Sequence, residues 1–221
     1  MIRLLFILFL GIGSLGLART QTLTKAERVA RTEQAIQALQ SGGLIVRLST
    51  QVRKIAALEE RLADPRLSVS QRERITKMRS ATQTESEAIN RLLVRMMREK
   101  YHLSELYFLP DTAFSMLGEA NSQTVFLNDD LELDPTIGPP QGDFLIMHIG
   151  YSDPSNTARA EGFILMDSAL EPIPAPFPSV IAFNNMGFAI NSLLAPELAE
   201  RRKIERAVER LVKKLEKLLE K

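Results

Sequence analysis

The chain has 221 residues, of which 45% are hydrophobic and 25% are charged, and it contains neither Cys nor Trp. These proportions exclude the collagen-like, low-complexity and wholly disordered classes. The absence of Cys excludes disulfides, thiolate metal sites and a Cys nucleophile. The formal net charge of +1 conceals three regions: residues 19–102 carry a net +8, residues 103–196 a net −11 and residues 197–221 a net +3.

Residues 1–18 have the pattern of a secretory signal peptide. Arg3 precedes the apolar run 4–17, and Gly16 and Ala18 place small residues before a cut after Ala18. As a helix this run reaches about 21 Å, short of a hydrocarbon core of about 30 Å, so cleavage is favoured over an uncleaved anchor. We therefore expect an exported protein, periplasmic or extracellular, with no nucleic-acid partner and at most peripheral membrane contact.

The basic region 19–102 is predicted to begin with a helix and a short strand. Thr24 and Glu27 have the spacing of a capping box, in which each side chain satisfies a free backbone N–H. Residues 41–43, Ser-Gly-Gly, end that helix. The β-branched-rich run 44–48 then favours a strand.

Two further helices, 50–63 and 70–101, are predicted to pair as an antiparallel hairpin that turns at residues 64–69. Ser70 and Glu73 have capping-box spacing at the start of the longer helix. Met96 and Met97 fit core packing better than an adaptable binding surface.

The acidic region 103–184 is predicted to form a small, mainly antiparallel sheet, because its short apolar runs follow one another with no long helix between them. The candidate strands are 105–109, 124–127, 143–150, 161–166 and 179–183, and the segment 113–117 is ambiguous. The alternating prolines of 172–178 predict extended chain, either a stiff connector or a ligand for a proline-recognising module. Residues 185–221 form the last region.

A regular helix follows Pro196. Its apolar residues recur at steps of 4, 3, 4 and 3, the a/d spacing of a coiled coil, and are Ile204, Val208, Leu211, Leu215 and Leu218. A short helix needs a packing partner to persist. This seam either docks within the chain or joins two copies of the chain by self-association, and both alternatives stay open. The basic and acidic regions likewise pair either within one chain or head-to-tail between copies.

The segment 128–135 places oxygen atoms at alternate positions, as a calcium loop does, with Asp130, Glu132 and Asp134 as weak candidate ligands. An EF-hand requires Gly at its sixth position and Glu at its twelfth, and both possible registers fail. A turn with solvated carboxylates is therefore favoured. His102 and His148 are 46 residues apart and do not have metal-ligand spacing. We expect no cofactor and no metal.

Catalytic signatures are missing from the sequence. It contains no G-x-S-x-G elbow, phosphate-binding loop, dinucleotide fingerprint or H-E-x-x-H motif. The acidic loops with Asp129, Asp130, Asp134 and Asp153 leave a hydrolase or glycan-binding domain as an alternative, and spacing singles out no pair among them. Catalytic residues therefore remain unknown, and an enzyme is the less favoured class.

Four segments resemble small uncharacterised secreted or envelope proteins of Bacteroidetes-type bacteria. They are 43–48 (GLIVRL), 106–108 (LYF), 125–135 (VFLNDDLELDP) and 176–178 (PFP). The resemblance covers residues 20–185 and implies an envelope location, with a signal peptide and helices before a small sheet. It transfers no functional residue, and the charged helix after Pro196 departs from it.

These observations predict an α+β fold and a non-enzymatic bacterial envelope protein that acts through protein–protein contacts of its helical arms. The alternatives are a peripheral membrane-surface protein that uses its basic helices and the hydrolase or glycan-binding domain with acidic loops. Glu residues interspersed among the bases and the lack of an interfacial aromatic face weaken the membrane alternative.

Overall fold

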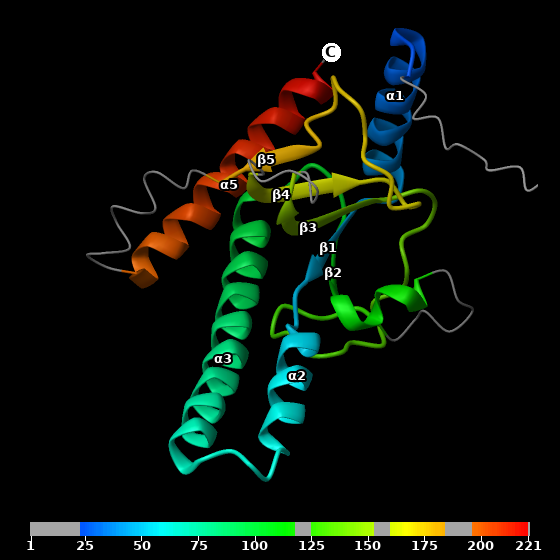
Figure 1. Cartoon of the computed structure of the whole chain (residues 1–221). Coiled ribbons are helices and arrows are strands. Elements are labelled where there is room, and N and C mark those ends of the chain that lie inside the picture. Colours follow the sequence, from blue (N-terminus) through cyan, green and yellow to red (C-terminus); the bar gives the residue numbers. More distant parts are fainter. Residues whose placement is uncertain (1–22, 118–124, 153–159, 184–195, 221) are drawn as a thin grey trace, which may run out of the picture.

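A computed structural model of the chain describes residues 23–117, 125–152, 160–183 and 196–220. The predicted signal peptide and Asp153 lie outside these residues. The α+β class is confirmed: helices pack against a five-stranded sheet of order β2-β1-β3-β4-β5 (Figure 1).

The sheet is mixed rather than mainly antiparallel. Its strands are β1 (Leu44–Leu48), β2 (Leu106–Pro110), β3 (Leu145–Tyr151), β4 (Glu161–Met166) and β5 (Val180–Ala182). β1 runs parallel to both β2 and β3, and the pairs β3–β4 and β4–β5 are antiparallel. The parallel pairing of β1 and β2 follows from their connection, because parallel strands need a long crossover and here the helical hairpin supplies it.

Two predicted segments of the acidic region differ from the structure. The described part of 124–127 forms no strand, and only Leu127 makes isolated bridges, to Phe108 and Leu133. The ambiguous segment 113–117 falls largely in a short 3-10 helix, η1 (Asp111–Met116). These segments instead cover one face of the sheet.

The strand β1 is buried on both faces of the sheet. Leu44, Val46 and Leu48 point into the larger apolar cluster, which the helices complete. Ile45 points into a smaller cluster on the opposite face, closed by residues of η1 and of the segment 125–144. A strand covered on both sides reads as a nearly continuous apolar run, which explains its composition.

The first helix, α1 (Lys25–Ser41), begins and ends where the sequence predicts. Thr24 and Glu27 form the capping box, and Gly42 is the C-cap. A Cβ atom on Gly42 would lie 2.0 Å from the carbonyl oxygen of Asp143. The close approach of the Asp143 backbone therefore requires glycine at position 42. Gly43 has φ +93°, a backbone conformation that favours glycine.

The hairpin consists of α2 (Val52–Leu62) and α3 (Val69–Lys100). The predicted cap of α3 is wrong by two residues, since Ser68 is the N-cap and exchanges capping-box hydrogen bonds with Gln71. Ser70 lies inside the helix, because the earlier Ser-x-x-Gln pair satisfies the free N–H groups first. Met96 and Met97 are buried in the core.

The C-terminal helix α5 (Pro196–Leu219) docks within the chain. It packs on α3 and β5, and four of its predicted seam residues are fully buried: Ile204, Val208, Leu211 and Leu215. Leu218 is partly buried against the same cluster. In this fold the seam is core, and its four fully buried side chains present no open surface to a partner.

The basic helices meet the acidic loops of the same chain. Arg31 of α1 pairs with Asp167 at 2.8 Å and Glu171 at 3.0 Å, and Arg98 of α3 pairs with Asp129 at 2.8 Å. Exposed ion pairs are worth roughly 0–1 kcal/mol each, so they bias the docking while the apolar clusters supply most of the stability.

Leu211→Ala should lower the free energy of unfolding by about 2–5 kcal/mol, because it empties part of a packed core. Lys213→Ala, at an exposed position of the same helix, is the matched control. Urea unfolding measures both variants. If Leu211→Ala kept wild-type stability but reduced the native mass, the seam would join two chains instead of docking within one.

Candidate functional site

The acidic segment 128–135 is a hydrogen-bonded turn. The side-chain oxygen of Asn128 accepts hydrogen bonds from the backbone N–H groups of Asp130 (3.0 Å) and Glu132 (2.9 Å). Asp134 accepts from the backbone N–H and hydroxyl of Thr136, and these bonds lower the pKa of its carboxyl. Within the described ranges, no three His, Asp or Glu side chains gather as a metal site would require.

The two histidines lie in unrelated places. His102 follows α3, and its Nε2 lies 3.2 Å from a carboxylate oxygen of Glu216 on α5. His148 lies on β3, directly across from Arg47 of β1 in the parallel register. The structure therefore keeps the two histidines apart. His148 lines a cavity at the end of the parallel strands.

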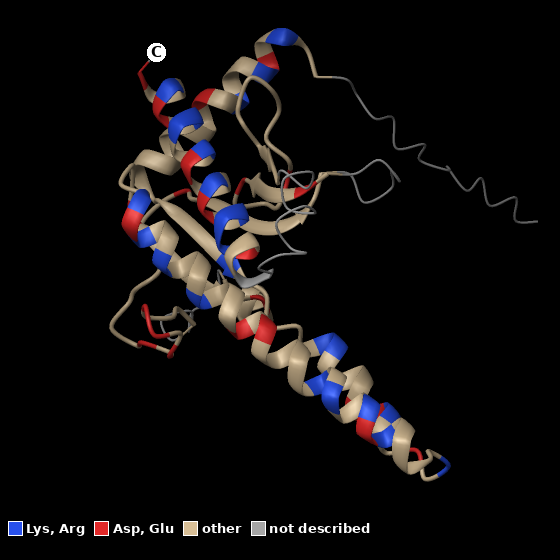
Figure 2. Cartoon of the chain, turned by 90° about the vertical axis from the view of Figure 1, so that its left-hand side faces the viewer, with Lys and Arg blue, Asp and Glu red and all other residues tan. Residues whose placement is uncertain are grey.

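The α2–α3 hairpin forms an arm that projects from the folded body and carries basic residues along its length, with acidic residues among them (Figure 2). Arg79 of α3 pairs with Glu59 of α2 at 2.8 Å, and Arg72 donates a hydrogen bond to the carbonyl of Leu62 at 2.7 Å. No residue of α2 is fully buried, and Ile75 and Thr82 are the buried residues of α3 before Leu93. The arm is thus only two helices thick.

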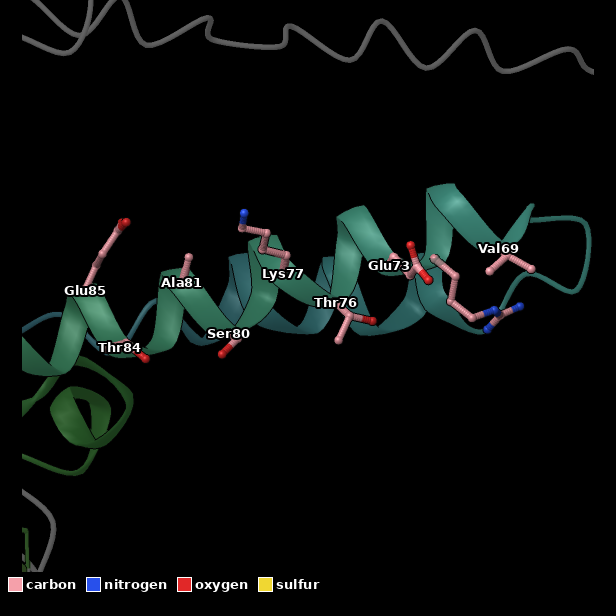
Figure 3. Close-up of a pocket in the computed structure, with 9 residues that line it drawn as sticks. Val69, Glu73, Thr76, Lys77, Ser80, Ala81, Thr84 and Glu85 are labelled. Carbon is pink, nitrogen blue, oxygen red and sulfur yellow. The ribbon is translucent and has the colours of Figure 1, made fainter.

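The outer face of α3 on this arm carries short side chains between charged ones. Thr76, Ser80, Ala81 and Thr84 lie along a surface depression flanked by Lys77 and other charged residues (Figure 3). All five of these side chains are exposed, and Val69, at the N-terminal end of the same surface, is 76% exposed. We call the exposed surface formed by Thr76, Ser80, Ala81 and Thr84 the outer strip of α3.

A cavity of about 420 Å³ lies at the carboxyl ends of the parallel strands, beside the base of the arm. Ser49 and Gln51 follow β1, Asp111 follows β2, and His148 lies on β3. In open sheets with parallel strands, ligands bind in the crevice outside these carboxyl ends. We call this cavity the strand-end crevice.

Hydrogen bonds to α3 and to Asp111, the residue after β2, hold one wall of the strand-end crevice in place. The carbonyl of Ser49 accepts from Ser86 Oγ (2.6 Å) and Asn90 Nδ2 (2.9 Å), both on α3. Oδ1 of Asp111 accepts from the backbone N–H of Thr50 (3.1 Å) and from its hydroxyl. The loop after β1 is therefore held from two sides.

The opposite wall centres on Lys203 of α5. Its Nζ lies 3.3 Å from Glu161 and 3.2 Å from Glu200, and 4.7 Å from the ring centroid of Phe183. The Lys203 side chain is only 10% exposed, so its charge is compensated inside the protein. This ion cluster ties α5 to β4 at the mouth of the crevice.

Arg47 and His148 lie side by side in the crevice. The Arg47 guanidinium rests on the Phe114 ring, 5.0 Å from its centroid. Burial lowers the pKa of His148, and the nearby Arg47 charge lowers it further, so the imidazole is neutral at neutral pH. A Cβ on Gly150 would lie 2.9 Å from His148 Nε2, so glycine gives the ring its space.

Arg47, Asp111 and Lys203 are not among the site residues that the sequence predicts. Two signals were available: Arg47 is the one charge inside an apolar strand, and Asp111 directly follows another strand. Their meeting depends on the parallel pairing, which no local pattern reveals.

Comparison with known proteins yields no match, since no protein-family model, curated protein or solved structure resembles the chain sufficiently. The strand-end crevice and the arm are therefore interpreted from their geometry. Within the described part of the chain, no helix is both long and apolar enough to cross a bilayer.

His148→Asn should make stability less dependent on pH. The unfolded chain binds a proton near pH 6.5 while the folded chain resists it, so wild-type stability falls as the pH drops through about 6.5. Urea midpoints at about pH 7.5 and about pH 5 measure this loss, and the variant should lose less. Comparing the change within each protein cancels the other titrating groups. An equal loss in both proteins would contradict the assignment.

Proposed function

We propose that this is an exported, non-enzymatic envelope protein, periplasmic or extracellular, that binds a partner protein through its α2–α3 arm. The observation that carries the proposal is the projection of a two-helix arm beyond the folded body (Figure 2). The sequence pattern of residues 1–18 supports export. The seam of the C-terminal helix is docked in the core and is not free for a partner, whereas both helices of the arm keep exposed faces.

The thinness of the arm favours a binding role. A hairpin of two helices buries little apolar surface, and helices in water depend on such packing. Val69, at the start of the outer face of α3, remains 76% exposed. A third helix laid along the arm would cover apolar surface that the chain itself leaves in water.

The outer strip of α3 suits a helix from the partner. Short side chains allow two helices to approach closely, since the interaxial distance depends on the side chains between them. Thr76, Ser80 and Thr84 recur every four residues and so lie on one face (Figure 3). Residues 52–85 carry 8 basic and 5 acidic side chains, so the partner surface is expected to be acidic.

Thr76→Arg combined with Ser80→Arg should release the protein from its complex. Both positions are exposed and Arg is a good helix former, so the arm should still fold. The two long Arg side chains should prevent a partner helix from packing on the outer strip. The measurement is the native mass, by light scattering, of protein extracted gently from its own envelope. The wild type should exceed the 24.8 kDa of the chain, and the variant should not.

The matched control is Gln37→Arg with Gln40→Arg on α1, which adds the same charge at exposed positions away from the arm. It should keep the wild-type mass. A wild-type protein that is monomeric on extraction would overturn the proposal. If the purified chain alone has the larger mass, the occupant of the strip is a second copy and not another protein.

A further inference from the structure

The strand-end crevice holds two groups of opposite charge that do not pair with each other. Among the described residues, the Arg47 guanidinium has no hydrogen bond or ion pair and contacts only the Phe114 ring as a cation–π partner. Oδ1 of Asp111 is taken by Thr50, while Oδ2 has no partner in the same part of the chain. Both residues line the crevice and a second cavity of about 590 Å³ beside it.

Separate anchors hold these two charges. The Phe114 ring positions Arg47, and the backbone and hydroxyl of Thr50 position Asp111, so neither side chain is arranged by the other. A planar guanidinium without an acidic partner favours a carboxylate, which it binds through two parallel hydrogen bonds. A free carboxylate oxygen favours an ammonium group for the complementary reason.

The remaining lining adds an apolar surface. Ile89 and Leu93 of α3, Ile149 of β3 and Phe183 border the same cavity. Its volume of about 420 Å³ falls within the range of small-molecule sites, roughly 300–1,000 Å³. The lining therefore fits a ligand that carries charged groups of both signs and an apolar part.

We propose that the strand-end crevice binds a free α-amino acid with an apolar side chain, its carboxylate on Arg47 and its ammonium group on Asp111. The proposal goes beyond contact through the arm and does not depend on it, because the outer strip of α3 and the crevice share no residue.

The charges of the crevice disfavour other ligand classes. Asp111, Glu161 and Glu200 line it together with Arg47 and Lys203, so its formal charge of −1 disfavours a phosphate dianion. A neutral sugar would cover Arg47 without compensating its charge. A zwitterion places an opposite charge on both Arg47 and Asp111 and leaves the net charge of the crevice unchanged.

The test is calorimetric titration of the purified protein with L-leucine and two analogues that each lack one charged group. One is 4-methylpentanoate, which lacks the amino group, and the other is 3-methylbutylamine, which lacks the carboxylate. Leucine should bind saturably, and each analogue should bind at least about tenfold more weakly, because a charged group in the protein is then left unpaired.

Two substitutions connect the binding to the named atoms. Arg47→Gln should weaken leucine binding at least about tenfold but affect 3-methylbutylamine little. Asp111→Asn keeps an oxygen for Thr50 and should weaken leucine but not 4-methylpentanoate. Lys54→Gln, which removes an exposed base of α2 that lines neither the crevice nor the second cavity, should change neither affinity. Circular dichroism checks folding, and Arg47→Lys replaces Arg47→Gln if the latter unfolds.

Either of two results would overturn the proposal. If 4-methylpentanoate binds as tightly as leucine, the site takes a simple anion. If none of the twenty common L-amino acids gives saturable heat with the wild type, the crevice is not an amino-acid site. Neither result bears on the proposed role of the arm, because that role is tested by the native mass of the complex.

Discussion

The double burial of β1 is the constraint on which the rest of the structure depends. Apolar side chains cover the strand on both faces, and β2 and β3 occupy both of its edges in parallel. Three parallel strands end at one edge of the sheet, so the loops after β1 and β2 meet there beside β3. The position of Arg47, Ser49 and Asp111 in one crevice is therefore a consequence of topology.

The crossover from β1 to β2 gives the hairpin two roles. Parallel strands require a long connection, and here it is two helices that continue past the sheet. At its base, Ser86 and Asn90 hold the carbonyl of Ser49 and so shape the crevice. Toward its tip nothing in the described chain covers the outer face of α3. The site and the arm share one element but present different surfaces.

Local sequence signals predicted the first helix and strand well, because helix caps, glycine stops and apolar periodicity depend on residues that are close in the sequence. The Thr24 capping box, the stop at Gly42 and the strand 44–48 all appear as expected. The mixed sheet could not be predicted, since the partners of β1 lie about 60 and 100 residues away and pairing is a long-range outcome. The seam of α5 had two open destinations, because an apolar stripe specifies that it is buried but not by which chain.

The distribution of charge separates what holds the fold from what is left for binding. Arg31, Arg98 and Lys203 are matched by acids of the same chain. The more exposed pairs of Arg31 and Arg98 contribute little to stability. Arg47 and Oδ2 of Asp111 break that pattern, as they lie in a cavity within a few residues of rigid strand ends and meet no opposite charge in the described chain. Each of the two groups is positioned by its own anchor, Phe114 or Thr50, while its charge meets no opposite charge from the described chain. A ligand that carries both missing charges would complete the two groups, which is the physical basis for placing a zwitterion at the carboxyl edge of the parallel strands.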